Sequence, residues 1–191
     1  MRVIAGKARR LLLKTTPGLD TRPTIDRIKE TLFNMINPYI PGSSFLDLYS
    51  GSGGIGIEAL SRGARFCVFV DNSFKAINCI KENLEFTKLS DDALVVQKNA
   101  ISAIAELSLK KYVFDIVYID PPYSAALEEE TLKALANSNI INEKSLIIIE
   151  ADKYNKLDCI ATLPFFIERE KEYKSNKHYF LRFGEANRNE D

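Results

Sequence analysis

The sequence predicts an α/β protein built on a mostly parallel, doubly wound sheet. From residue 44 onward, apolar runs of strand length alternate with amphipathic segments of helix length. A glycine-rich loop follows the first of these strands, and a loop with two adjacent prolines follows the fourth. Strands that alternate with helices pair in parallel beneath two helical layers, and ligands bind at their carboxyl ends. The pattern therefore predicts both the fold and the edge of the sheet that carries the chemistry.

The N-terminal segment differs from the rest in charge. Residues 1–29 hold eight basic side chains against two acidic ones, so the remainder of this neutral chain carries a net charge of −6. Residues 2–4 and 10–13 predict two short strands around Gly6, followed by a loop. Such a basic hairpin can follow a phosphate backbone, or it can be a solvated tail without a partner.

An amphipathic helix is expected next, over residues 25–36. Thr24 can cap it, and Asp26 lies in the first turn, where the helix dipole favours an acid. Pro38 ends it. We therefore divide the chain into a basic hairpin and loop (residues 1–23) and one domain (residues 24–191).

The remaining elements follow in alternation. The expected strands are residues 45–48, 66–70, 93–97, 114–119 and 145–150. The expected helices are residues 54–61, 73–86, 100–107 and 127–136. Two further strands, residues 165–173 and 177–183, predict a hairpin that adds an antiparallel edge to the sheet.

Composition excludes several classes of protein. No apolar run reaches membrane-spanning length. Three widely spaced cysteines argue against a disulfide framework and a zinc site, and the single histidine, His178, leaves little for a histidine triad. We expect a cytoplasmic, monomeric protein without a metal ion or a membrane partner.

The loop after the first strand predicts a nucleotide-like ligand. Gly51, Gly53 and Gly56 allow a sharp turn and close approach of a ligand at the start of a helix. Asp71, twenty residues after Gly51, ends the second strand, where a carboxylate can accept both hydroxyls of a ribose. The pattern suits a nicotinamide dinucleotide as well as S-adenosylmethionine.

Two polar residues favour S-adenosylmethionine. Asp47 stands just before the glycines, where it would repel a pyrophosphate but attract an ammonium group. Asn99, after the third strand, can hydrogen-bond an adenine edge, although it can equally cap the following helix.

The fourth strand ends in Asp120-Pro121-Pro122-Tyr123. Prolines have no backbone N–H, so the strand stops and presents a carboxylate, two bare carbonyl groups and an aromatic ring. An isolated match of this length can also be an ordinary strand-ending turn.

Taken together, these motifs resemble the class I S-adenosylmethionine-dependent methyltransferases that act on amino groups. Residues 4–7 (Ile-Ala-Gly-Lys) and 21–34 (Thr-Arg-Pro-Thr-x-Asp-Arg-x-Lys-Glu-Thr-Leu-Phe-Asn) resemble the RsmD-type members, which methylate N2 of one guanine in small-subunit (16S) rRNA. The likeness covers essentially the whole chain. It implies a Rossmann-like seven-stranded sheet with a C-terminal antiparallel hairpin and a small N-terminal β-hairpin. Arg10 departs from the family, which has a glycine at this turn.

The resemblance also implies site residues. The implied cofactor site consists of Asp47, Tyr49, Gly51, Gly53, Asp71, Asn72, Asn99 and Ala100. The implied catalytic residues are Asp120, Pro121, Pro122 and Tyr123. Our candidates for contact with small-subunit rRNA or a ribosomal particle are Lys7, Arg9, Arg10, Arg22 and Thr24. These could instead brace the helix of residues 25–36 against the sheet.

The chemistry of N2 methylation suits these residue types. The lone pair of the guanine amine is delocalised into the ring, so acceptors aimed at its two N–H bonds would localise that lone pair toward the methyl group. Asp120 and the Pro121 carbonyl can be those acceptors, and no strong general base is required. Tyr123 can stack on an extruded base, an interaction worth roughly 1–3 kcal/mol, or it can be a half-buried core tyrosine.

Three other functions remain open from the sequence. A nicotinamide-dependent oxidoreductase would explain the glycine loop but not Asp-Pro-Pro-Tyr. A non-catalytic RNA-binding module would explain the basic arm but not the cofactor loop. A related amino-methyltransferase could act on DNA adenine, protein glutamine or another RNA base.

Overall fold

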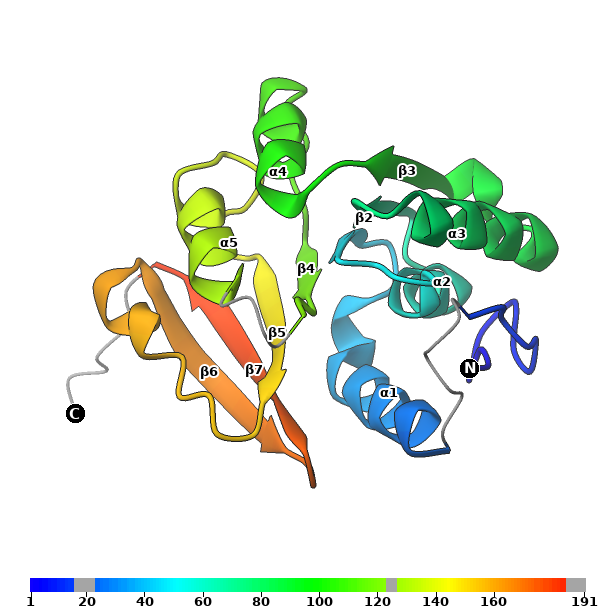
Figure 1. Ribbon diagram of the computed structural model, residues 1–191, viewed down its shortest axis with the longest axis horizontal. Helices are drawn as coiled ribbons and strands as arrows, with labels where there is room; N and C mark the ends of the chain where they lie inside the picture. The colour runs from blue at the N-terminus through cyan, green and yellow to red at the C-terminus, as the bar shows by residue number, and fades with distance from the viewer. Residues whose placement is uncertain (16–22, 123–126, 185–191) are drawn as a thin grey trace.

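The computed structural model describes residues 1–15, 23–122 and 127–184 and shows one seven-stranded sheet (Figure 1). The strand order is β3-β2-β1-β4-β5-β7-β6, and only β7 and its neighbours pair antiparallel. The strands are β1 (Ser44–Leu48), β2 (Phe66–Asp71), β3 (Ala93–Gln97), β4 (Ile116–Ile119), β5 (Leu146–Asp152), β6 (Phe165–Glu172) and β7 (Asn176–Phe183). This confirms the predicted mostly parallel α/β fold with its C-terminal hairpin.

The helices lie close to their predicted positions. They are α1 (Pro23–Ile36), α2 (Gly54–Ser61), α3 (Phe74–Thr87), α4 (Ala100–Leu109) and α5 (Leu127–Ala136), with short 3-10 turns η1 (Asn37–Tyr39), η2 (Ser90–Asp92) and η3 (Asp158–Thr162). The expected start of α1 was wrong: the helix begins at Pro23, because proline is favoured in the first helical position. Thr24 therefore lies inside the first turn of the helix.

The fourth strand is shorter than expected. β4 begins at Ile116: the Phe114 amide donates to the Ile140 carbonyl at 2.8 Å, outside the sheet, whereas the Asp115 amide donates to Ser44 of β1 at 3.0 Å. Ser73, which we expected to be helical, is the N-cap of α3, and its Oγ accepts from the Ala76 amide.

Helices cover both faces of the sheet. One buried cluster joins α1, α2 and α3 to the sheet through residues such as Phe33, Ile57 and Ile80. The other joins α4 and α5 to the opposite face through residues such as Ile104 and Leu132. None of the helices in the described ranges is long and apolar enough to cross a membrane.

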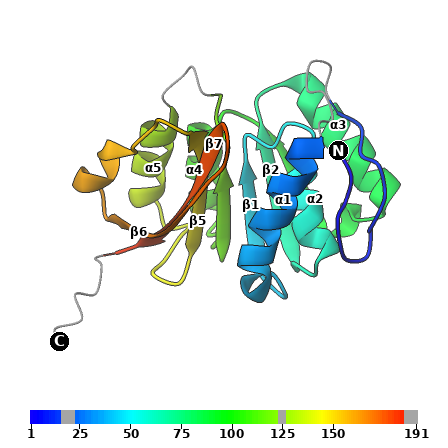
Figure 2. The same ribbon diagram turned by 90° about the horizontal axis from the view of Figure 1, so that it is seen from below.

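The N-terminal segment is a looser hairpin than predicted. A single antiparallel bridge, Arg2 with Leu12, replaces two strands, and turns occupy residues 5–10. Val3 and Ala8 are buried against the cluster under α2, so the segment follows the shape of that surface. Figures 1 and 2 both show it beside α2 and α3, at the end of the molecule opposite β6 and β7.

The backbone conformation at Arg10 is the one for which the family's glycine is suited. Its φ is +73°, in the left-handed region that favours glycine. The turn is therefore the one that a glycine would make, and arginine occupies it at some cost in backbone strain.

Candidate active site

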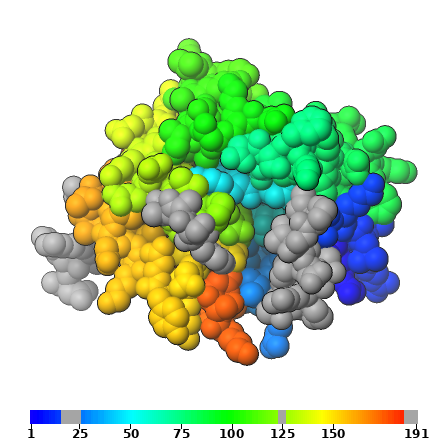
Figure 3. All heavy atoms as spheres, viewed as in Figure 1, coloured from blue at the N-terminus to red at the C-terminus, as the bar shows by residue number. Residues whose placement is uncertain are grey.

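A large cavity opens at the carboxyl ends of the parallel strands. Its volume is about 1180 Å³. The order of strands reverses between β1 and β4, which is where open α/β sheets bind ligands. The predicted residues that line the cavity are Asp47, Tyr49, Gly51, Asp71, Asn72, Asn99, Ala100, Asp120, Pro121 and Pro122. In Figure 3, cyan atoms of the β1–α2 region lie in the middle of the face shown, between the green middle and yellow-orange later parts of the chain.

The glycine loop shapes one wall of this cavity. Gly51 has a φ of +56°, and a Cβ added there would meet no atom within 4 Å. Gly53 also has a positive φ, but its α-carbon faces Phe69 and Ile80 and does not line the cavity. Gly51 thus leaves room for a ligand, whereas Gly53 permits the turn into α2.

Asp71 fixes this loop to the end of β2. One carboxylate oxygen accepts from the Gly51 amide at 2.9 Å, and the other accepts from the Ser73 amide at 2.8 Å. Asn99 caps α4 through Oδ1, which accepts from the Ser102 amide at 2.8 Å. Asn99 also lines the cavity, so both interpretations of this residue are compatible with its position.

Asp47 is more deeply buried than we expected for a residue that contacts the ligand. Its side chain is buried and accepts from the Gly56 amide at 2.9 Å. Burial raises the pKa of Asp47 to about 7, and the nearby Asp71 carboxylate adds to the shift. A cation entering the cavity would favour its ionised form.

Tyr49 belongs to the same wall. Its φ is +63°, and its hydroxyl shares a 2.7 Å hydrogen bond with Thr131 Oγ1 of α5. Burial raises the pKa of Tyr49, so its hydroxyl stays protonated.

Asp120 stands where β4 ends, and Pro121 and Pro122 complete the described part of the motif. Burial raises the pKa of Asp120 well above its usual range, and the carboxylates of Glu150 and Asp47 raise it further. Tyr123 lies outside the described residues.

The cavity also holds a second polar group, which was not predicted from the sequence. Tyr118, Glu150, Asn176 and His178 line it and are hydrogen-bonded to one another through the Glu150 carboxylate. Glu150 follows the apolar run of β5, as Asp120 follows that of β4. This shared position after an apolar run could have indicated from the sequence that Glu150 lines the site. The contribution of β7 carried no local signal, because it depends on antiparallel pairing with β5.

Helix α1, which packs beside α2, forms another wall of the cavity. Ile28, Lys29 and Leu32 line it, together with Met1 of the N-terminal segment. These residues carried no ligand motif in the sequence.

The basic residues of the arm lie outside the cavity. Lys7, Arg9 and Arg10 are exposed, and within the described ranges they form no ion pair. The Lys7 amide donates to Ser61 at the end of α2, a helix of eight residues and so about 12 Å from the glycine loop. Arg22 and the side chain of Thr24 lie outside the described part of the structure.

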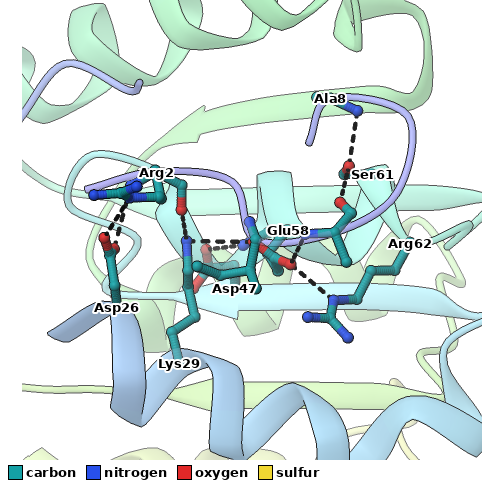
Figure 4. Close-up of polar contacts among 11 residues, drawn as sticks. Arg2, Ala8, Asp26, Lys29, Asp47, Glu58, Ser61 and Arg62 are labelled. Carbon is teal, nitrogen blue, oxygen red and sulfur yellow. Dashed lines mark hydrogen bonds and ion pairs between the residues drawn. The ribbon is translucent and has the colours of Figure 1, made fainter. Parts of the chain in front are cut away.

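A buried ionic cluster holds the arm and α1 against α2 (Figure 4). Glu58 accepts from the Ile4 and Ala5 amides at 2.8 and 3.0 Å and from Arg62 at 2.7 Å. Lys29 lies 3.3 Å from the same carboxylate and donates to the Arg2 carbonyl at 2.6 Å. The cluster therefore places the helix that forms this wall of the cavity.

No group of three or more metal-ligating side chains is found within the described residues.

Comparison with known proteins agrees with this arrangement. The family described as Conserved hypothetical protein 95 matches residues 1–182. The Bacillus subtilis protein YlbH is 41% identical over 153 residues, which are 80% of this chain and 83% of YlbH. Ribosomal RNA small subunit methyltransferase D of Escherichia coli K12 is 35% identical over 173 residues, 90% of this chain and 84% of that one.

A solved structure shares the fold over the full length. The Escherichia coli protein yhhF has a TM-score of 0.82 and 32% identity, and the match covers 97% of this chain and 99% of that one. The chain thus belongs to the Conserved hypothetical protein 95 family, the RsmD family of class I methyltransferases, as its motifs predicted.

Proposed function

We propose that this protein transfers a methyl group from S-adenosylmethionine to N2 of a guanine in small-subunit rRNA, guanine 966 of 16S rRNA in the family's usual numbering. One observation carries the proposal: a single cavity joins the glycine loop, Asp71 and Asn99 to Asp120 and Pro121. The name of the Escherichia coli relative supports the substrate class. The cytoplasm, where ribosomes are assembled, is the expected compartment.

The residues of the cavity fit the cofactor. Gly51 leaves open space where any side chain would intrude, and Asp71 stands at the strand end that suits a ribose. Asp47 lines the cavity, and its ionised form would attract a cation and repel a pyrophosphate. The cavity also exceeds the roughly 300–1,000 Å³ typical of a site for one small ligand, which leaves room for a base beside the cofactor.

The transfer needs positioning more than acid–base chemistry. When bound, S-adenosylmethionine supplies a methyl group already activated on a sulfonium. The Asp120 carboxyl group, which can accept through an oxygen even when protonated, and the Pro121 carbonyl would accept hydrogen bonds from the two N–H groups of the amine and direct its lone pair toward that methyl group. Pro122 keeps the turn rigid, and Tyr123 would stack on the base.

The test of this function is transfer of labelled methyl to unmodified small-subunit particles, which are then digested to nucleosides. We expect the label in N2-methylguanosine. Label in another nucleoside would keep the reaction class and discard the guanine assignment. Absence of label in particles and naked RNA, with a protein that binds the cofactor, would contradict the proposal.

The arm offers a second test. Reversing two charges, with Arg9→Glu and Arg10→Glu, should weaken RNA binding about tenfold or more at ~0.1 M salt and lower the slope of log affinity against log salt by one to two units. Filter binding over a range of salt concentrations measures both. The matched control reverses Lys111 and Lys144, which are exposed and precede β4 and β5, at the end of the sheet away from the cavity. Equal affinity for the wild type and the arm variant at low salt would remove the arm from the RNA surface.

A further inference from the structure

A second carboxylate, Glu150, lies beside Asp120 at the mouth of the cavity. Strands β4 and β5 pair in parallel register, with Ile119 opposite Ile149, so the next residue of each strand places Asp120 next to Glu150. Both residues line the cavity, and 17% of the Glu150 side chain is exposed to it. Two carboxylates therefore face the space left for the target base.

Hydrogen bonds fix the orientation of Glu150. Tyr118 donates its hydroxyl to Oε2 at 2.6 Å, and His178 Nε2 lies 3.1 Å from the same oxygen. Asn176 donates its side-chain amide to Oε1. His178 is fully buried, and its other ring nitrogen lies 3.1 Å from the Tyr173 hydroxyl. The carboxylate is thus held by β4, β7 and the end of the β6–β7 hairpin.

The network also keeps Glu150 ionised. Burial by itself would raise the pKa of Glu150, but the contacts with His178, Tyr118 and Asn176 together lower it below its usual value. An ionised carboxylate only accepts hydrogen bonds, so Glu150 suits a donor on the base and not a second acceptor.

Guanine carries such a donor next to its reactive amine. The N1–H and the N2 amine are adjacent on the same edge of the ring, whereas adenine places an N1 lone pair next to its amine. The ionised Glu150 carboxylate matches the N1–H donor of guanine and repels the N1 lone pair of adenine.

Given the proposed function, we propose that Glu150 is a specificity-determining residue that accepts the N1–H of the target guanine beside Asp120. A site built to bond a donor rejects a substrate without it, because its own polar group is left unpaired. The inference deepens the proposed function by assigning the recognition of guanine to one side chain.

The experiment uses small-subunit RNA in which the target guanine is replaced by 2-aminopurine, which keeps the amine but lacks the N1–H. For the wild type we expect kcat/KM to fall by at least ~100-fold relative to guanine. In Glu150→Gln the carboxamide can donate to N1, so this preference should shrink by at least ~10-fold. The 2-aminopurine base also lacks O6, so RNA with 6-thioguanine, which retains N1–H, should be methylated nearly as well as guanine.

Matched variants complete the test. Glu129→Gln, an exposed residue of α5, should keep the wild-type preference. The ratio of kcat/KM for the two substrates is measured within one preparation, so a smaller folded fraction does not change it. Glu150→Asp, which keeps the charge, should still prefer guanine.

Two results would overturn the assignment and leave the proposed function standing: equal use of both bases by the wild type, or an unchanged ratio in Glu150→Gln. Failure of the wild type to methylate guanine N2 would instead overturn the proposed function, and this assignment with it.

Discussion

Replacing Asp120 with alanine is expected to lower kcat by about 10³-fold, while S-adenosylhomocysteine still binds within a few-fold of the wild-type affinity. The side chain would accept an N–H of the target amine, and removing one preorganised group of this kind costs roughly 10²–10³ in kcat. The cofactor half of the cavity depends on β1, β2 and β3, which the change does not touch. Single-turnover methyl transfer and calorimetric titration measure the two quantities separately.

The controls for this variant isolate the acceptor. Asp91→Ala removes an exposed carboxylate from η2 and should leave kcat unchanged. Asp120→Asn keeps one acceptor oxygen and should restore part of the activity. Near-wild-type kcat in Asp120→Ala would show that the amine is oriented by other groups.

The sequence predicted those parts of the site that have a local cause. Gly51 stands three residues after β1 and Asp120 directly after β4, and the topology of parallel sheets brings such positions to one edge. Contacts that depend only on the pairing of strands distant in the sequence cannot be predicted in this way. Glu150 meets His178 only because β7 returns antiparallel beside β5, across 28 residues of sequence.

The N-terminal segment shows a different limit. Its charges and its turn at Gly6 were visible in the sequence, and strand pairing was predicted from them. The structure follows the buried positions Val3 and Ala8, which pack on α2 and override the weak β pattern. Lys29 and Glu58 were indistinguishable from ordinary helical charges until the packing brought them together.

The largest expected loss of stability comes from this ionic cluster. Glu58→Ala should lower the free energy of unfolding by about 3–5 kcal/mol, because it leaves Lys29 buried with an uncompensated charge and removes the partner of two backbone amides. Burial already lowers the pKa of Lys29, and Glu58 opposes that shift, so the lysine depends on this carboxylate to remain charged. Urea unfolding measures the change.

Two further variants distinguish the effect of breaking this buried ionic cluster from the effect of breaking an ordinary ion pair. Glu82→Ala breaks the exposed pair with Lys14 and should leave the free energy of unfolding nearly unchanged. Adding Lys29→Met to Glu58→Ala removes the stranded charge, so stability should partly recover. A loss below about 1 kcal/mol in Glu58→Ala would mean that packing alone holds the arm and α1. Because Lys29 and Leu32 line the cavity, the destabilised variant should also bind the cofactor more weakly, which would connect the ionic cluster to the site.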